Sequence, residues 1–253
     1  MRVLALIVLA ACAAGVEAPQ QTAEVQTRSD DLEFTALAPG VWMHTAYKDV
    51  PPYGPIRTNG LIVASVPGEA VLIDSAWDDA QTARIVAWSR KTLGRRIAAS
   101  VHTHAHDDKM GGVAALMAAG VVTYASVETN AAAPPRGLTP AARSLPRLPD
   151  GTLETPDALG PIEVLYPGPG HTSDNVVVRV IGTDVLFGGC LIRPGRSTSL
   201  GNTVDGDVSR WGDTVRTVAA RFPHAHLIVP SHGAPGGRAL LDHTAALADD
   251  AAR

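Results

Sequence analysis

Short apolar runs alternate with amphipathic segments along most of this chain. Runs with the length and β-branched content of strands lie at residues 41–46, 60–65, 69–74, 97–102 and 121–125, and the pattern restarts at 162–166, 176–181, 184–187 and 226–230. Helical patterns and end signals mark residues 78–93, 113–119, 208–222 and 237–252. Each half of the chain is therefore expected to fold as strands followed by alternating strands and helices.

Two β-rich layers with helices outside both are the natural packing for such a pattern, so we predict an α/β fold. Three prolines and a glycine within residues 47–55 indicate a projecting loop or hairpin. Residues 128–148, rich in Pro, Ala and Arg, have no pattern that assigns them an element. The length of 253 residues allows one substantial core, and we expect a single domain over residues 31–253.

The segment 104–112 (HAHDDKMGG) directly after a predicted strand places two imidazoles and a carboxylate within five residues. His104 and His106 share a side only on extended backbone, so they can reach one ion only from a loop or strand end. The register H-x-H-x-D followed by x-x-G-G begins at His104, which makes Asp108 the ligand rather than Asp107. His102 is then expected to be a core residue or a support behind the ligands.

Three more candidate ligands fall just past predicted strand ends, where α/β sheets gather their ligands: His171, Cys190 and His232. Each histidine alone is more often a satisfied surface or core residue, and Cys190 alone could be a small buried apolar residue. Together with the motif they make six ligands. Because tetrahedral zinc with one open position takes three protein ligands, six suffice for two ions.

Composition and the N-terminus limit the partners and the compartment. The net charge of −4, without a Lys/Arg run, argues against nucleic acid. Arg2 followed by the apolar run 3–11 is typical of an export signal. Residues 9–12 (LAAC) resemble a lipobox that would lipidate Cys12; the alternative is cleavage after residues 11–13 (ACA), and 15–30 would form a flexible tether. We expect a periplasmic protein, anchored to the outer membrane if lipidated.

Four segments in order carry a family resemblance: 104–112 (HAHDDKMGG), 166–175 (YPGPGHTSDN), 187–192 (FGGCLI) and 231–233 (SHG). From about residue 41 onward the chain resembles the subclass B1 metallo-β-lactamases of the New Delhi and Verona types. The resemblance implies a four-layer αβ/βα sandwich and zinc-dependent hydrolysis of the amide bond of penicillins, cephalosporins and carbapenems, which confers antibiotic resistance. It assigns one zinc to His104, His106 and His171 and a second to Asp108, Cys190 and His232, with a hydroxide between them.

The resemblance also implies roles around the metals. Asn202 is similar to the residue that helps to hold the reacting carbonyl oxygen, and Asp108 would also orient the hydroxide. Arg193 stands where many members carry a lysine that binds the substrate carboxylate; Arg196 is the alternative. Tyr53 lies in a segment that resembles the family's mobile flap over the substrate, although a plain turn would also explain it.

Asp74 ends a predicted strand, where it could support the ligands or simply form a turn. The chain is expected to be a monomer that acts on a small-molecule substrate.

Rival functions remain at this point. Glyoxalase II, lactonases and ribonuclease Z share the resembled fold but carry H-x-H-x-D-H, and here the final position is Lys109, a poor metal ligand. A serine hydrolase is disfavoured because the chain has no G-x-S-x-G segment. A non-catalytic zinc-binding lipoprotein is the alternative from a different class.

Overall fold

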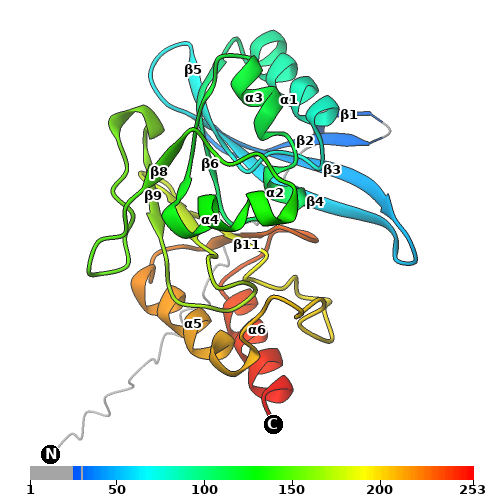
Figure 1. Ribbon diagram of the computed structural model, residues 1–253, viewed down its shortest axis with the longest axis vertical. Coiled ribbons are helices and arrows are strands. Elements are labelled where there is room, and N and C mark those ends of the chain that lie inside the picture. The colour runs from blue at the N-terminus through cyan, green and yellow to red at the C-terminus, as the bar shows by residue number, and fades with distance from the viewer. Residues whose placement is uncertain (1–24, 30) are drawn as a thin grey trace, which may run out of the picture.

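Two β-sheets lie face to face between outer helices in the computed structural model, which describes residues 25–29 and 31–253 (Figure 1). The large sheet has the strand order β1 to β8, with bounds Val25–Arg28, Leu32–Ala38, Val41–Val50, Gly54–Ala64, Glu69–Ile73, Arg96–His102, Val122–Ser126 and Arg143–Leu145. The small sheet has the order β12-β11-β10-β9, from Leu227–Pro230, Val185–Gly189, Val177–Val180 and Ile162–Leu165. The layers confirm the predicted αβ/βα sandwich.

Helices cover the outer face of each sheet. On the large sheet lie α1 (Asp79–Thr92) and α3 (Val113–Ala118), and on the small sheet lie α5 (Val208–Arg221) and α6 (Ala239–Ala251) (Figure 1). The side chain of Asp78 accepts a hydrogen bond from the backbone N–H of Gln81 and so caps α1. The four predicted helices are thus confirmed, with ends that differ from the predicted ones by at most two residues.

Three apolar cores hold the four layers together. Alternate residues of one strand serve different cores: Leu61 packs between the two sheets, whereas Ile62 packs under α1 and α3. The third core lies between the small sheet and its helices, around the fully buried Trp211. Because both faces of the central strands are covered, their sequences are continuously apolar rather than alternating.

Several elements went beyond the sequence prediction. The prediction of a flexible tether over residues 15–30 is wrong at its C-terminal end, because residues 25–28 form β1, an antiparallel edge strand paired with β2. The unassigned region 128–148 contains α4 (Val127–Ala132), the short 3-10 helix η1 (Pro134–Arg136) and β8, which extends the sheet in parallel to β7. A short helix, α2 (Asp107–Met110), lies inside the segment 104–112. Such short or edge elements carry too few residues for a periodic signal.

The predicted projecting segment is the turn of a long hairpin. Strands β3 and β4 pair in register from Val41 with Val63 to Val50 with Gly54, so the hairpin extends beyond the predicted strands. Tyr53 lies in its turn with 77% of its surface exposed.

The N-terminal leader and Cys12 lie outside the described residues. Within the described part of the chain, no helix has the length and apolar character needed to span a membrane.

Candidate metal centre

The loop after β6 presents the first two histidines. The backbone N–H of His106 donates to the carbonyl of His104 at 3.0 Å, which closes a turn within the loop. The Asp174 carboxylate accepts from the backbone N–H of Ala105, which connects the loop to the second half of the chain. His106 has extended backbone (φ −119°, ψ 157°) and precedes α2. The two imidazoles therefore lie on one side, as the spacing predicts, with ring centroids 4.7 Å apart.

His171 completes a triad of facing ring nitrogens. Nδ1 of His106 lies 3.2 Å from Nε2 of His104 and 3.2 Å from Nε2 of His171. Nitrogens bound to one tetrahedral zinc at about 2.0–2.1 Å would lie about 3.3 Å apart. The ring of His171 is held edge-on against Trp211, with centroids 5.7 Å apart. The geometry of this triad fits a zinc ion.

A second triad lies beside the first and joins a carboxylate, a thiol and an imidazole. The separations are 3.8 Å from Cys190 Sγ to Asp108 Oδ2, 3.4 Å from Sγ to His232 Nε2, and 3.5 Å from that nitrogen to Oδ2. Zinc–sulfur bonds of about 2.3 Å and zinc–nitrogen or zinc–oxygen bonds of about 2.0–2.2 Å imply about 3.3–3.6 Å between ligands. His104 also lies within 4.8 Å of Asp108 and Cys190, so the triads are neighbours.

The topology explains why Cys190 and His232 meet. Strands β11 and β12 are parallel neighbours, so their carboxyl ends reach the same edge of the small sheet, and each residue follows its strand directly or within two residues. Gly189, with φ +59°, turns the chain just before Cys190. Asp108 comes to the same point from the other half of the chain, on α2.

Hydrogen bonds on the far side of the rings orient the nitrogens that face the two triads. His104 Nδ1 lies 3.2 Å from the Thr103 hydroxyl, which in turn donates to Asp74 at 2.9 Å. His232 Nδ1 donates to the carbonyl of Arg57 at 2.6 Å. In each case the bond places the proton on Nδ1 and leaves the Nε2 lone pair facing the triad. Asp74 thus acts through Thr103, and its positive φ of 59° also makes a turn at the strand end.

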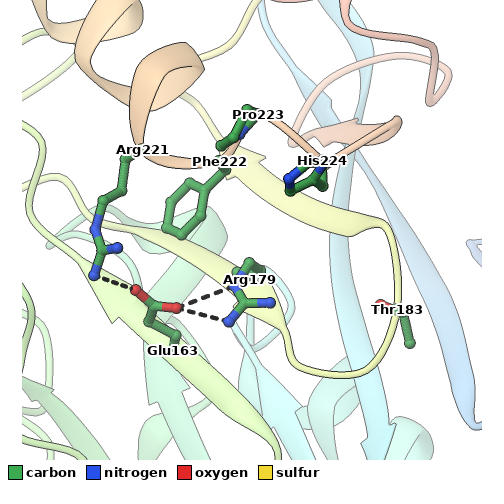
Figure 2. A pocket seen from close by; sticks show the side chains of 8 residues that line it. Glu163, Arg179, Thr183, Arg221, Phe222, Pro223 and His224 are labelled. Atoms are coloured by element: carbon green, nitrogen blue, oxygen red, sulfur yellow. Dashed lines mark hydrogen bonds and ion pairs between the residues drawn. The ribbon is translucent and has the colours of Figure 1, made fainter.

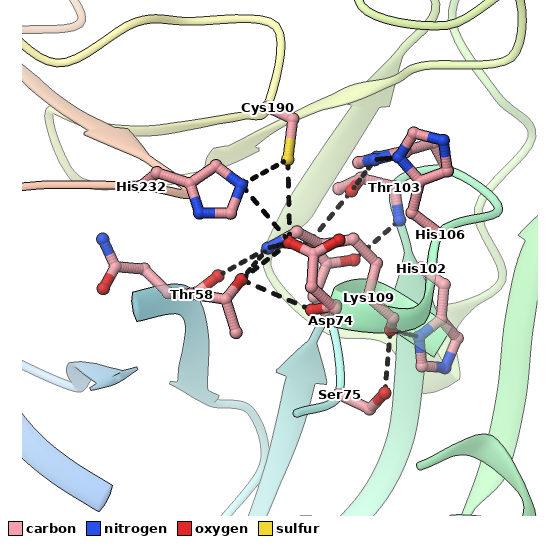
Figure 3. A network of polar contacts seen from close by, with 12 residues as sticks. Thr58, Asp74, Ser75, His102, Thr103, His106, Lys109, Cys190 and His232 are labelled. Carbon is pink, nitrogen blue, oxygen red and sulfur yellow. Dashed lines mark hydrogen bonds and ion pairs between the residues drawn. The ribbon is translucent and has the colours of Figure 1, made fainter. Parts of the chain in front are cut away.

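Lys109 is buried beside the second triad, an environment that the sequence did not predict. Its side chain is completely buried, and Nζ donates to Thr58 Oγ1 at 2.6 Å and to the carbonyl of Asn59 at 3.1 Å. The same ammonium lies 3.2 Å from Asp108 Oδ2 and 3.9 Å from Asp74 Oδ2. Figure 3 shows Lys109 within this polar network, together with Asp74 and Thr58. Lys109 is therefore a buried counter-charge beneath the second triad.

Charges in the cluster favour the deprotonated thiol. Burial alone would raise the pKa of Cys190, but the nearby charges of His232, Lys109 and His104 lower it well below its usual range. Burial likewise opposes the ionised form of Lys109, yet Asp108, Cys190 and Asp74 together raise its pKa. A thiolate is the form that binds zinc, so the donor set suits this metal chemically as well as geometrically.

Asp107 and Asp108 differ in burial and in their partners. Asp108 is buried in the second triad, whereas the Asp107 side chain is 58% exposed and pairs with Lys48 at 3.6 Å. His102 is fully buried, and its Nδ1 atom donates to the carbonyl of Lys109 at 2.8 Å.

The residues expected to bind substrate are exposed or half-buried. Asn202 Oδ1 accepts from the backbone N–H of Val204 at 3.1 Å, in an exposed loop. The guanidinium of Arg193 is half-buried against Gly201, where a Cβ would come within 3.0 Å of Nη2. Arg196 is exposed, and so is Tyr53 in the hairpin turn.

Supporting residues around the centre were missed by the sequence analysis: Thr58, Asn59, Thr103, Asp174, Arg136 and Asp205. They are single polar residues without a motif, and their partners lie as far as 174 positions away. No sequence signal short of the tertiary contacts could have found them.

A separate hollow of about 250 Å³ lies where the end of α5 meets β9 and β10 (Figure 2). Glu163 binds Arg179 and Arg221 across it, at 3.0 and 2.8 Å. None of the predicted site residues lines it. Both arginines of the hollow pair with the Glu163 carboxylate, and the pair with Arg221 connects the end of α5 to the small sheet.

Comparison with known proteins agrees with the geometry. The model of the metallo-β-lactamase superfamily matches residues 53–232. A type 2 metallo-β-lactamase from Bacteroides fragilis is 34% identical over 216 residues, with 85% of each chain covered. The crystal structure of the metallo-β-lactamase FIM-1 from Pseudomonas aeruginosa, in a mono-zinc form, is 48% identical with a TM-score of 0.84, covering 90% of this chain and 99% of that one.

A metallo-β-lactamase structure from Hirschia baltica is 49% identical, with a TM-score of 0.82 over 87% of this chain and 98% of that one. Likeness of this extent spans both halves of the centre and both sheets, and it confirms the resemblance stated from the motifs. The chain therefore belongs to the metallo-β-lactamase superfamily, and within it to the zinc-dependent β-lactamases of subclass B1.

Proposed function

We propose that the six clustered side chains hold two zinc ions and that the protein uses them to hydrolyse the amide bond of penicillins, cephalosporins and carbapenems. One ion would bind to the three histidines, and the other to Asp108, Cys190 and His232. The observation that carries this proposal is the pair of adjacent triads, whose donor atoms lie 3.2 Å apart in one and 3.4–3.8 Å apart in the other.

Zinc, when bound, supplies an acidic water near pH 7 and polarises the reacting carbonyl. The chain's own residues prepare the site for this chemistry. The outer hydrogen bonds fix the rings of His104 and His232, and Lys109 offsets the negative charge of Asp108 and Cys190. Asp108, at the boundary of the two triads, would also orient the attacking water.

We assign substrate binding to Asn202, Arg193 and Tyr53. Asn202 keeps its Nδ2 donors free of partners among the described residues, as a group that holds a carbonyl oxygen must. Arg193 places a cation against Gly201, directly before Asn202, where a bidentate guanidinium would meet a substrate carboxylate. Arg196 is the alternative cation, and Tyr53 would close over the substrate from the hairpin turn.

The activities of glyoxalase II and the lactonases, which carry a histidine directly after the motif aspartate, are less well supported for this chain. The corresponding Lys109 donates to Thr58 and Asn59 and is fully enclosed, so it has no lone pair to offer a metal. Cys190 takes that place in the second triad. For the compartment, we propose export to the periplasm as a monomer, with Cys12 as the lipid anchor if the lipobox is used.

The test is carbapenem hydrolysis together with metal analysis. Purified protein should contain two zinc ions per chain and bleach a carbapenem's absorbance; a chelator should abolish the activity, and added zinc should restore it. Activity that persists in protein with only trace metal would refute the proposal. Two bound zinc ions without turnover of any β-lactam would favour the non-catalytic zinc-binding alternative.

A further inference from the structure

A carboxylate outside both triads links three distant parts of the chain. Asp205 lies in the segment between β11 and α5, three residues after Asn202. Its Oδ2 atom accepts from His106 Nε2 at 2.9 Å and from Arg136 Nη1 at 2.8 Å.

The contact with Asp205 determines which nitrogen of His106 faces the metal. Because Nε2 donates to the carboxylate, the lone pair is on Nδ1, the atom that lies 3.2 Å from Nε2 of both His104 and His171. His106 thus uses the opposite nitrogen from the other two histidines. Its orientation depends on a carboxylate in an irregular segment rather than on a backbone carbonyl or a neighbouring residue.

Arg136 supplies the fixed end of this link. It ends η1, and the preceding Ala133 is fully buried in a small apolar cluster with Ala105, Met110 and Val113. Ala105 and Met110 belong to the metal-binding motif itself. The short helix that carries Arg136 is therefore anchored through Ala133 on the same unit that carries His106, while Asp205 comes from the segment between β11 and α5.

We propose that Arg136 is a positioning residue of the metal centre: it holds Asp205, which orients His106 in the three-histidine site and ties the Asn202 segment to the motif. This inference rests on the proposed function, because it assumes zinc on the three histidines. No contact joins Asp205 or Arg136 to Asp108, Cys190 or His232 among the described hydrogen bonds and ion pairs, so one site should be affected and the other spared.

The experiment measures zinc affinity at each site by competition with a chromophoric chelator. Asp205→Ala should weaken the three-histidine site about 10–100-fold, as removal of a ligand's outer partner does, and Arg136→Ala about three- to tenfold. In cobalt-loaded protein, the thiolate charge-transfer band of the Cys190 site should keep its intensity. Arg136→Lys, which keeps the charge, should recover part of the affinity.

A double variant distinguishes action through Asp205 from a general effect. If Arg136 works through the carboxylate, Arg136→Ala should have no further effect in Asp205→Ala protein. The matched control is Arg147→Ala: Arg147 is 38% exposed and pairs with Glu128 at 2.9 Å, against 37% exposed and 2.8 Å for Arg136. This control should leave both zinc affinities unchanged.

Three results would overturn the inference. They are an Arg136→Ala protein with unchanged affinity at the three-histidine site, an equal loss at both sites, and an undiminished loss in the Asp205→Ala background. Failure of the proposed function would appear differently, as an unmutated protein that binds no zinc at the three histidines.

Discussion

Replacement of the buried Lys109 by methionine should destabilise the metal-free protein strongly. Methionine keeps the length and apolar stem of the side chain but removes the ammonium group that lies 3.2 Å from Asp108 and 3.9 Å from Asp74. It also removes the donors to Thr58 and to the carbonyl of Asn59. Two buried carboxylates and the Cys190 thiolate would then lose a counter-charge that they share.

The distances give the size of the effect. With an effective dielectric constant of about 20, attraction between unit charges is about 5 kcal/mol at 3.2 Å, the separation from Asp108. Asp74, at 3.9 Å, contributes less, because burial raises the pKa of its carboxyl to about 7 and it is only partly ionised at neutral pH. Relief of the ammonium group's desolvation offsets part of this, and breaking a buried ion pair from one side typically costs about 3–5 kcal/mol. We expect a loss of that size in the free energy of unfolding of the metal-free protein. The loss should be smaller with zinc, because a divalent cation also compensates Asp108 and Cys190.

Urea unfolding of chelator-treated and zinc-loaded protein measures both losses. The adjacent pair provides the control: Lys48→Met removes the partner of Asp107, but Lys48 is 44% exposed and the ion pair is 3.6 Å long, so the loss should stay below about 1 kcal/mol. If metal-free Lys109→Met protein loses less than about 1 kcal/mol, the counter-charge reasoning is wrong. It is equally wrong if both lysine variants lose the same amount.

Three further predictions concern the thiolate, the substrate and pH. Cys190→Ser replaces a soft thiolate by a hydroxyl that stays protonated, so the second site should lose zinc and the cobalt charge-transfer band should vanish while the three-histidine site keeps its ion; a band that survives would exclude Cys190 as a ligand. Arg193→Ala should mainly raise KM for several β-lactams, with kcat changed less, whereas unchanged KM values would move carboxylate binding to Arg196. Burial lowers the pKa of His44 to about 3, below its unfolded value of about 6.5, so the unfolded chain binds the proton more tightly and stability falls as pH drops from about 6.5 toward 3. This contribution, about 1.4 kcal/mol per pH unit, should be missing in His44→Gln, as urea unfolding of metal-free protein at pH 7 and 5 would show, and parallel pH profiles for the two proteins would contradict it.

Local sequence signals determined much of the architecture. Apolar runs such as residues 60–65 predicted central strands because a strand covered on both faces must be continuously apolar. The capped pattern from Asp78 predicted α1. The edge strand β1 and the elements within 128–148 escaped prediction because each is too short to show a period, and its place depends on a neighbouring strand or helix.

The same division holds for the metal centre. The sequence by itself supplied all six proposed ligands, because a metal site needs particular donor types and the H-x-H-x-D spacing can serve only an extended loop. Only the tertiary structure could decide what surrounds them. The burial of Lys109, the choice of nitrogen on His106 and the link through Asp205 and Arg136 arise from contacts between residues 50 to 99 positions apart. Such contacts depend on how the two sheets pack, so the residues adjacent in sequence carry no signal that predicts them.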